Sequence, residues 1–336
     1  MTERSDAPLK WDLFVTSGIP TVTPNPPPGE KRRFFSPISS TLIHGQRDAV
    51  LVDTFMTVDQ NDALVDWVKG SGKNLTTIYI THGHGDHWFG IGALLERFPG
   101  ARAPASPAVV KMMKDQSPEV LKSWWNARLP GQIPERVVIA EELAGNVIAL
   151  EGQDLVVVEV GHTDTHDTTV LHVPAIGLVV AGDAAYNGVH QLLAETDPQK
   201  RREWMAALDT IESLKPRAVI AGHKRPGNAD SPRILEETRQ YIRDFDRIAE
   251  TATAARELYD QMLRPHSVGC RSVRDRGTEC TVHRAEDSRH REVAKPGIAL
   301  GSGPRDRGFE SRLPDHFTVT SSSGRTSKTL EKSNRS

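Results

Sequence analysis

One pattern, repeated four times along the chain, limits most strongly what this sequence can fold into. Each time, an apolar run of strand length stops, and glycine and one or more potential metal ligands follow within a few residues. The four segments are TTIYITHGHGDH at 76–87, VVVEVGH at 156–162, GLVVAGD at 177–183 and RAVIAGH at 217–223. In layered folds of helices and sheets, binding sites lie beyond the ends of strands. The pattern therefore predicts that all four loops meet at one edge of the sheets.

The first of these loops is the richest in ligands. Gly83 and Gly85 separate its side chains and relieve the backbone where they must converge. Imidazole nitrogen and carboxylate oxygen are ligands that divalent cations prefer, zinc above all. A polar surface turn would explain a single histidine, but it does not explain this H-x-H-x-D-H spacing of His82, His84, Asp86 and His87.

The other three loops add His162, with His166 four residues later, then Asp183 and His223. Both cysteines of the chain, Cys270 and Cys280, lie near its end. The main part of the chain therefore offers no thiol nucleophile and no disulfide framework. Closed structural zinc sites are usually rich in cysteine, whereas open catalytic sites mix histidine with carboxylate. A non-catalytic metal-binding module is the alternative from another class of protein.

The order of the predicted elements favours an α/β fold built in layers. A hairpin is expected around the turn at 45–48, and buried strands at 76–80, 177–183 and 217–223. Four further apolar segments span 136–140, 147–150, 154–160 and 168–173. Helical spacing predicts helices at 57–70, 87–98, 107–128 and 198–214, and one long or two shorter helices over 231–263.

Composition and charge narrow the class of protein. The 336 residues are 37% hydrophobic and 26% charged, which is enough to bury a sizeable core. The polar start MTERSDAPLK and the lack of a long apolar run predict neither a secretory signal nor a membrane span, so the cytoplasm is the expected location. Residues 1–264 hold 28 basic and 35 acidic residues, a net charge of −7. Such an acidic domain argues against nucleic acid as a partner.

The last part of the chain differs in character from the rest. Residues 265–336 hold fourteen basic and nine acidic residues, a net charge of +5, and only 11 of these 72 residues are Leu, Ile, Val or Phe. That fraction is below what a folding chain needs. We expect 265–336 to be a tail without a fold, either disordered or produced by a frameshift or read-through.

With these motifs in this order, residues 36–263 resemble the metallo-β-lactamase superfamily of hydrolases. The resemblance implies a four-layer αββα sandwich, with residues 1–264 as one hydrolase domain and the metals at the upper edge. It also implies two divalent metal ions. The first would be held by His82, His84 and His162, the second by Asp86, His87 and His223, and Asp183 would bridge the two.

This chain departs from the family at its third motif. The family usually has Gly-His-Thr-Pro-Gly-His, whereas this sequence reads GHTDTH at 161–166. The first histidine of the motif is the family's ligand, which favours His162 over His166. His166 would then contact a ligand rather than the metal.

The implied chemistry is hydrolysis by a hydroxide that two metals share. Asp86 or Asp183 would carry the proton to the leaving group. Tyr186 follows Asp183 by three residues, and acyl-homoserine lactonases of the superfamily have a tyrosine at the same offset. Its phenol could donate to a developing oxyanion, although packing in the core would explain a tyrosine there equally well. We expect an esterase or lactonase acting on a small molecule, and activity on acyl-homoserine lactones would make it a quorum-quenching enzyme.

Two other hydrolase activities stay open. A glyoxalase II-like thioesterase shares all seven ligands. A β-lactam hydrolase is less favoured, because several such enzymes have a cysteine where this chain has Asp183. A homodimer is the default expectation for a soluble enzyme that oligomerises.

Several residues near the motifs could belong to the site or to the core. The aromatic residues Trp88, Phe89, Trp124 and Trp125 could line an apolar pocket, and at least two of them are expected to be core residues instead. His190 is expected to be a solvated or capping residue. Lys224 could steer an anionic substrate, with a surface position as the default.

Overall fold

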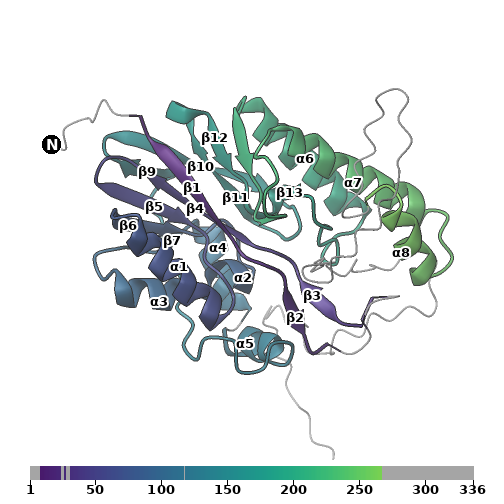
Figure 1. Cartoon of the computed structure of the whole chain (residues 1–336). Coiled ribbons are helices and arrows are strands. Elements are labelled where there is room, and N and C mark those ends of the chain that lie inside the picture. The colour runs from purple at the N-terminus through teal and green to yellow at the C-terminus, as the bar shows by residue number, and fades with distance from the viewer. Residues whose placement is uncertain (1–7, 24–25, 28–30, 117, 267–336) are drawn as a thin grey trace, which may run out of the picture. The chain divides into compact units, whose positions relative to one another are not determined.

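The computed structural model describes residues 8–23, 26–27, 31–116 and 118–266 (Figure 1). Two β-sheets of mixed direction form its centre. The first has the order β1-β4-β5-β6, with bounds β1 (Lys10–Val15), β4 (Ser39–His44), β5 (Asp48–Val52) and β6 (Asn74–Tyr79). The second has the order β14-β12-β11-β10-β9, with bounds β14 (Ala218–Ile220), β12 (Leu178–Val180), β11 (Thr168–Val173), β10 (Gln153–Gly161) and β9 (Val147–Leu150).

Alternating side chains of the strands face two different layers of the core, as the pleat of a strand requires. In β5, Ala49 and Leu51 pack towards helices, whereas Val50 and Val52 pack against the second sheet. In β12, Val179 likewise faces helices and its two neighbours face the first sheet. Three apolar clusters therefore separate four layers, and the predicted αββα sandwich is confirmed.

The outer layers consist of helices, as Figure 1 shows. The first sheet is covered by α1 (Val58–Gly70), α3 (Ile91–Arg97) and α4 (Pro107–Asp115), with α5 (Pro118–Asn126) beside them. The second sheet is covered by α6 (Pro198–Ser213), α7 (Arg233–Ala249) and α8 (Ala255–Leu263). Helix α1 begins where predicted because Thr57 and Gln60 form a capping box that satisfies two free N–H groups.

Two predicted helices are interrupted, so the expectation of continuous helices over 87–98 and 107–128 was wrong. The first divides into α2 (Gly85–Trp88) and α3, because the N–H of Gly90 donates to Thr54 Oγ1 at 3.0 Å instead of continuing the helix. The second divides before α5, whose first residue is Pro118. Proline has no N–H to donate and disfavours helical geometry in the residue before it.

Short strands complete the described fold: β2 (Ile19–Thr21), β3 (Arg33–Phe35), β7 (Pro104–Ala105), β8 (Glu141–Glu142), β13 (Tyr186–Asn187) and β15 (His223–Lys224). The apolar segment 136–140 is not itself a strand, whereas the other three apolar segments are β9, β10 and β11. Among the described residues, no helix has both the length and the apolar character needed to cross a membrane. The tail predicted at 265–336 lies outside the described residues from 267 onwards.

Glu151 ties the β4–β5 turn to the second sheet. Its carboxylate accepts backbone N–H bonds from Gln46, Arg47 and Asp48 at 2.9, 2.6 and 2.8 Å. The bonds from Asp48 and from its two neighbours lower the pKa of Glu151. A carboxyl whose pKa is lowered by folding stabilises the fold above its unfolded pKa, and this contribution is lost as pH falls through the folded pKa.

We expect Glu151→Ala to lower the free energy of unfolding by about 1 kcal/mol at neutral pH, a modest value because the carboxylate is close to solvent. The difference from wild type should narrow in acid. Urea unfolding at pH 7 and at pH 4 measures both effects, with Glu159→Ala at an exposed glutamate of β10 as the control. Equal costs for the two variants at pH 7 would contradict this role of Glu151.

Candidate metal centre

Strand pairing explains why the predicted ligand loops meet. Strands β12 and β14 are parallel neighbours in the register Val180↔Ile220, so Asp183 and His223 leave the same edge of the second sheet. Strands β5 and β6 are also parallel, and the loop with the first four ligands follows β6. Because parallel strands end together, the side chains that follow them converge.

The glycines of the repeated pattern allow the two loops of the second sheet to touch. The N–H of Gly222 donates to the carbonyl of Gly182 at 2.7 Å. A Cβ on Gly222 would lie 2.2 Å from Asp183 Oδ1, and Gly182 itself has a φ of +50°. Only residues without a side chain fit here, so the glycines before Asp183 and His223 follow from this close approach.

The structure brings six of the seven predicted ligands into groups compact enough to hold metal ions. The three groups in the described residues are His82, His84, Asp164 and Asp183; Asp53, His82 and His87; and Asp86, His87 and His223. Asp183 also contacts the third group, because its two oxygens lie 3.3 Å from His87 Nε2 and 3.2 Å from His223 Nε2. The predicted second metal set of Asp86, His87 and His223 is thus one physical cluster.

The inner ring nitrogen of each buried histidine is held by a neighbour. His87 Nδ1 lies 3.2 Å from Asp53 Oδ2, and His223 Nδ1 lies 3.1 Å from the carbonyl of Pro37. His82 Nδ1 lies 3.0 Å from Thr81 Oγ1. Such contacts fix the ring and its tautomer, so that Nε2 of each histidine points to the shared centre.

Several of the converging atoms fit divalent metal ions. Buried polar atoms are almost always hydrogen-bonded. At this site five buried atoms have no hydrogen-bond partner among the described residues: His82 Nε2, His87 Nε2, His162 Nε2, Asp164 Oδ2 and Asp183 Oδ1. All five are atoms that zinc and similar ions bind. The donor set therefore fits the metals that the sequence predicts.

The charged side chains at the centre shift one another's pKa values. Burial raises the pKa of Asp183, but His223 and His87 outweigh burial and hold it well below its usual value. Burial lowers the pKa of His223, yet Asp183 and Asp86 raise it to about 9. Burial, reinforced by His87, lowers the pKa of His82 well below its usual value. His82 is thus a neutral imidazole with a free lone pair, as a metal ligand must be.

His84 differs from the other histidines because two carboxylates flank it. Its Nδ1 lies 3.0 Å from Asp164 Oδ2, and its Nε2 lies 3.2 Å from Glu195 Oε1. Burial alone would lower the pKa of His84, but Asp164 and Glu195 raise it well above its usual value. Sequence reasoning assigned neither carboxylate to the site.

His162 lies outside the three groups, although its Nε2 is buried. Its role as a ligand of the first metal stays a prediction. His166 is exposed, and its Nδ1 lies 2.6 Å from Asp167 Oδ2.

Asp53, Asp164 and Glu195 are the site residues that sequence reasoning missed. Asp53 follows the apolar strand β5, so a carboxylate directly after a strand was the available signal. Asp164 lies inside the GHTDTH motif, where it occupies the family's proline position. Nothing near Glu195 in the sequence marks it, because it reaches the site only through the fold.

Tyr186 lies in the centre itself. Its hydroxyl donates to Asp183 Oδ2 at 3.0 Å, and its ring stacks on His223 with centroids 5.6 Å apart. The side chain is 4% exposed, and burial together with Asp183 raises its pKa well above its usual value. Tyr186 is therefore a protonated donor at neutral pH, although it is also part of the core around α6.

The aromatic residues have different positions. Trp88 and Phe89 are core residues, and the Trp88 Nε1–H donates to the carbonyl of Gly83 at 2.9 Å, which supports the ligand loop from behind. Trp125 contacts Phe35 at a centroid distance of 5.1 Å, and Phe35 contacts His223 at 5.8 Å. Aromatic side chains thus form a continuous row from His223 to α5.

Two expectations for polar residues were wrong. His190 is not solvated: it is 2% exposed, and its Nδ1 lies 3.0 Å from the hydroxyl of Tyr241. Lys224 does not take the default surface position, because its side chain is buried against the carboxylate of Asp230. Its ammonium also donates to the carbonyl of Asn228 at 3.1 Å, so Lys224 fixes the loop after β15 instead of steering a substrate.

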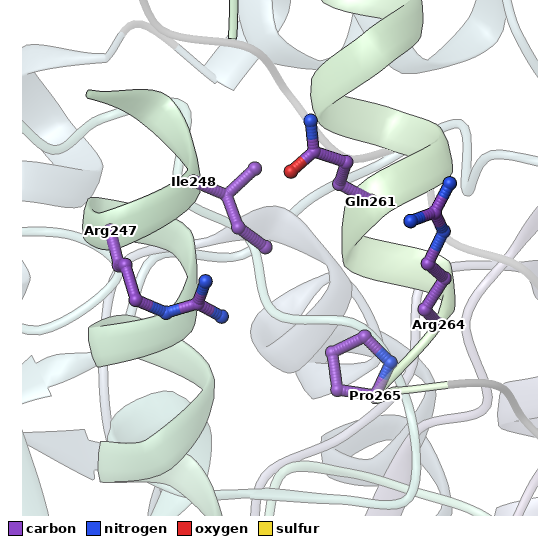
Figure 2. Close-up of a pocket in the computed structure, with 5 residues that line it drawn as sticks. All are labelled: Arg247, Ile248, Gln261, Arg264 and Pro265. Atoms are coloured by element: carbon purple, nitrogen blue, oxygen red, sulfur yellow. The ribbon is translucent and has the colours of Figure 1, made fainter. Parts of the chain in front are cut away.

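A separate cavity of about 320 Å³ lies where α7 and α8 approach each other (Figure 2). It is lined by Arg247, Ile248, Gln261, Arg264 and Pro265. None of these five residues is a predicted ligand, so this cavity is distinct from the metal centre.

Comparison with known proteins identifies the family. A sequence profile of the metallo-β-lactamase superfamily matches residues 33–223, more than half of the chain. The protein belongs to the metallo-β-lactamase superfamily, and the resemblance found in its motifs is confirmed. A comparison with curated proteins finds no match.

Solved structures with a similar fold include two metallo-β-lactamases. The enzyme from Pontibacter korlensis has 18% identity and a TM-score of 0.50, over 69% of this chain and 100% of that chain. FIM-1 from Pseudomonas aeruginosa, in its mono-zinc form, has 18% identity and a TM-score of 0.50, over 71% of this chain and 96% of that chain. At this identity the likeness shows the fold alone.

Proposed function

We propose that the protein is a hydrolase that uses two divalent metal ions, zinc above all, to cleave a carboxylic ester and in particular a lactone. The observation that carries the proposal is the central position of Asp183. Its carboxylate contacts His87, His223 and Tyr186 at 3.3, 3.2 and 3.0 Å. From this position one carboxylate can bind both metal ions and still contact Tyr186, the residue that would donate a hydrogen bond to the substrate.

The residues of the chain divide the work between them. His82 and His84 would hold the first metal, with His162 as the third histidine implied by the family, and Asp86, His87 and His223 would hold the second. Two bound ions supply a nucleophile near neutral pH and polarise the attacked carbonyl. Asp86 Oδ2, which lies 3.2 Å from His223 Nε2, or Asp183 would pass a proton to the leaving oxygen.

The preference for a lactone rests on Tyr186. Its hydroxyl is protonated, buried and within reach of Asp183, so it can turn from that carboxylate to the developing oxyanion of an ester carbonyl. Phe35 and Trp125 extend from His223 and offer an apolar surface for an acyl chain. Acyl-homoserine lactones combine both features, so quorum quenching is part of this proposal.

A β-lactam hydrolase is the second candidate, because structures named metallo-β-lactamases share the fold. Asp183 favours an ester substrate over a β-lactam, because several β-lactam hydrolases have a cysteine at this position. A thioester substrate would use the same ligands. Detection of any one of these three reactions would distinguish an enzyme from a non-catalytic metal-binding module.

The direct test is a pH-stat assay of zinc-loaded protein with a long-chain acyl-homoserine lactone, with and without chelator. We expect acid release that stops with chelator and returns when zinc is restored. No acid release from protein shown to hold two metals would reject the lactone and turn the test to thioesters and β-lactams. Absence of all three activities would favour the binding module.

Tyr186→Phe should lower kcat for the lactone, on the order of 10²-fold or less, with a smaller change in KM. The variant removes only the hydroxyl, and the ring can still stack on His223. Steady-state kinetics together with metal content measures the effect. Tyr259→Phe in α8 is the control for loss of a tyrosine hydroxyl. An unchanged kcat would reduce Tyr186 to a packing residue.

A further inference from the structure

Asp164 is the most unusual residue of the centre. It is fully buried, and Thr163 Oγ1 donates to its Oδ1 at 3.0 Å. Its other oxygen, Oδ2, lies 3.0 Å from His84 Nδ1 but has no hydrogen-bond partner among the described residues. A buried carboxylate oxygen without a hydrogen bond is costly unless a cation binds it.

The surroundings of that oxygen are those of a metal ligand. One carboxylate oxygen of Asp164 and one ligand atom each of His82, His84 and Asp183 all lie within 4.8 Å of one another. Imidazole nitrogen and carboxylate oxygen are ligand types that divalent ions bind, and the two carboxylates balance the charge of one such ion. In the family motif this position is a proline, whose side chain has no atom that could bind a metal.

Glu195 acts on the same histidine from its opposite side. Its Oε1 lies 3.2 Å from His84 Nε2, and Thr165 Oγ1 donates to its Oε2 at 2.7 Å. A carboxylate at Nε2 holds the proton on that nitrogen, so the lone pair of His84 is on Nδ1, the nitrogen next to Asp164. Thr165 in turn fixes the carboxylate.

We propose that Asp164 is an additional ligand of the first metal and that Glu195 is the positioning residue that turns His84 Nδ1 towards it. The substitution GHTDTH for the family motif would then supply a carboxylate to the first metal, and the buried Thr163 and Thr165 on either side would orient Asp164 and Glu195. This inference rests on the two-metal site of the proposed function but not on its substrate.

The test measures metal binding directly. Full-length metal-free protein is titrated with zinc in competition with a chromophoric chelator, which resolves two dissociation constants. Asp164→Asn keeps the shape and the bond from Thr163 but loses the charge, so we expect the affinity of one zinc to fall at least tenfold while the other is kept. Asp164→Ser is a second variant if the first does not fold.

The matched control is Asp167→Asn, because Asp167 lies three residues away, is half exposed and forms an ion pair with His166 at 2.6 Å. Glu195→Gln should weaken the same zinc by about tenfold to a hundredfold. Cobalt loading gives a second readout, since the absorption of the first site should change in Asp164→Asn and not in the control.

Two wild-type dissociation constants in folded Asp164→Asn would overturn the ligand role of Asp164. Unchanged zinc affinity in Glu195→Gln would overturn the positioning role. Failure of the protein to hydrolyse a lactone would leave both binding results unaffected, so the two proposals fail separately.

Discussion

Asp183→Ala should reduce lactone turnover by three orders of magnitude or more. Asp183 is 1% exposed and contacts His87, His223 and Tyr186. Its removal would take away the carboxylate proposed to bridge the two metal ions. Metal ions contribute several kcal/mol to the stabilisation of a transition state, and about 4 kcal/mol corresponds to a thousandfold in rate. The lost side chain is small, so the sandwich should still form.

The measurement combines kcat, zinc content and far-ultraviolet circular dichroism. Asp183→Asn keeps the shape of the side chain and shows whether the charge alone is required. Asp154→Ala, at an exposed aspartate of β10, is the control for loss of a carboxylate. Normal turnover by an Asp183→Ala protein that still binds two metals would rule out the bridging role.

Gly222→Ala should lower turnover by about a hundredfold, although it changes no ligand. The added Cβ would lie 2.2 Å from Asp183 Oδ1, 2.8 Å from the carbonyl carbon of Gly182 and 3.0 Å from His87 Cε1. One of these neighbours is backbone, so the contact cannot be relieved by turning a flexible side chain. A displacement of about 1 Å at a catalytic group costs on the order of 10²-fold in rate.

Kinetics and zinc affinity should therefore fall together in Gly222→Ala. Gly70→Ala at the end of α1 is the matched control, because a Cβ there meets nothing within 4 Å. Wild-type kinetics together with wild-type zinc affinity in Gly222→Ala would contradict this prediction. The close approach of Gly222 to Gly182 would then not be needed for the site.

Much of the fold could be predicted from the sequence, because the relevant signals are local. The turn between β4 and β5, the cap of α1 and the apolar strands each depend on a few adjacent residues. Predictions were wrong where a distant residue competes for a backbone group, as at Gly90, whose N–H bonds Thr54. A helical pattern cannot show such a competitor.

The sequence by itself determined the family, the layered fold and six residues that the structure brings into groups compact enough to hold a metal, because these residues follow strands that end at one edge. Only the tertiary structure decided which residues surround those ligands. Asp53 joins His87 across 34 positions, and Glu195 joins His84 across 111. The tertiary structure also decided that Lys224 and His190 are buried. Such contacts depend on how the two sheets and their loops pack, and no local pattern of residues encodes that packing.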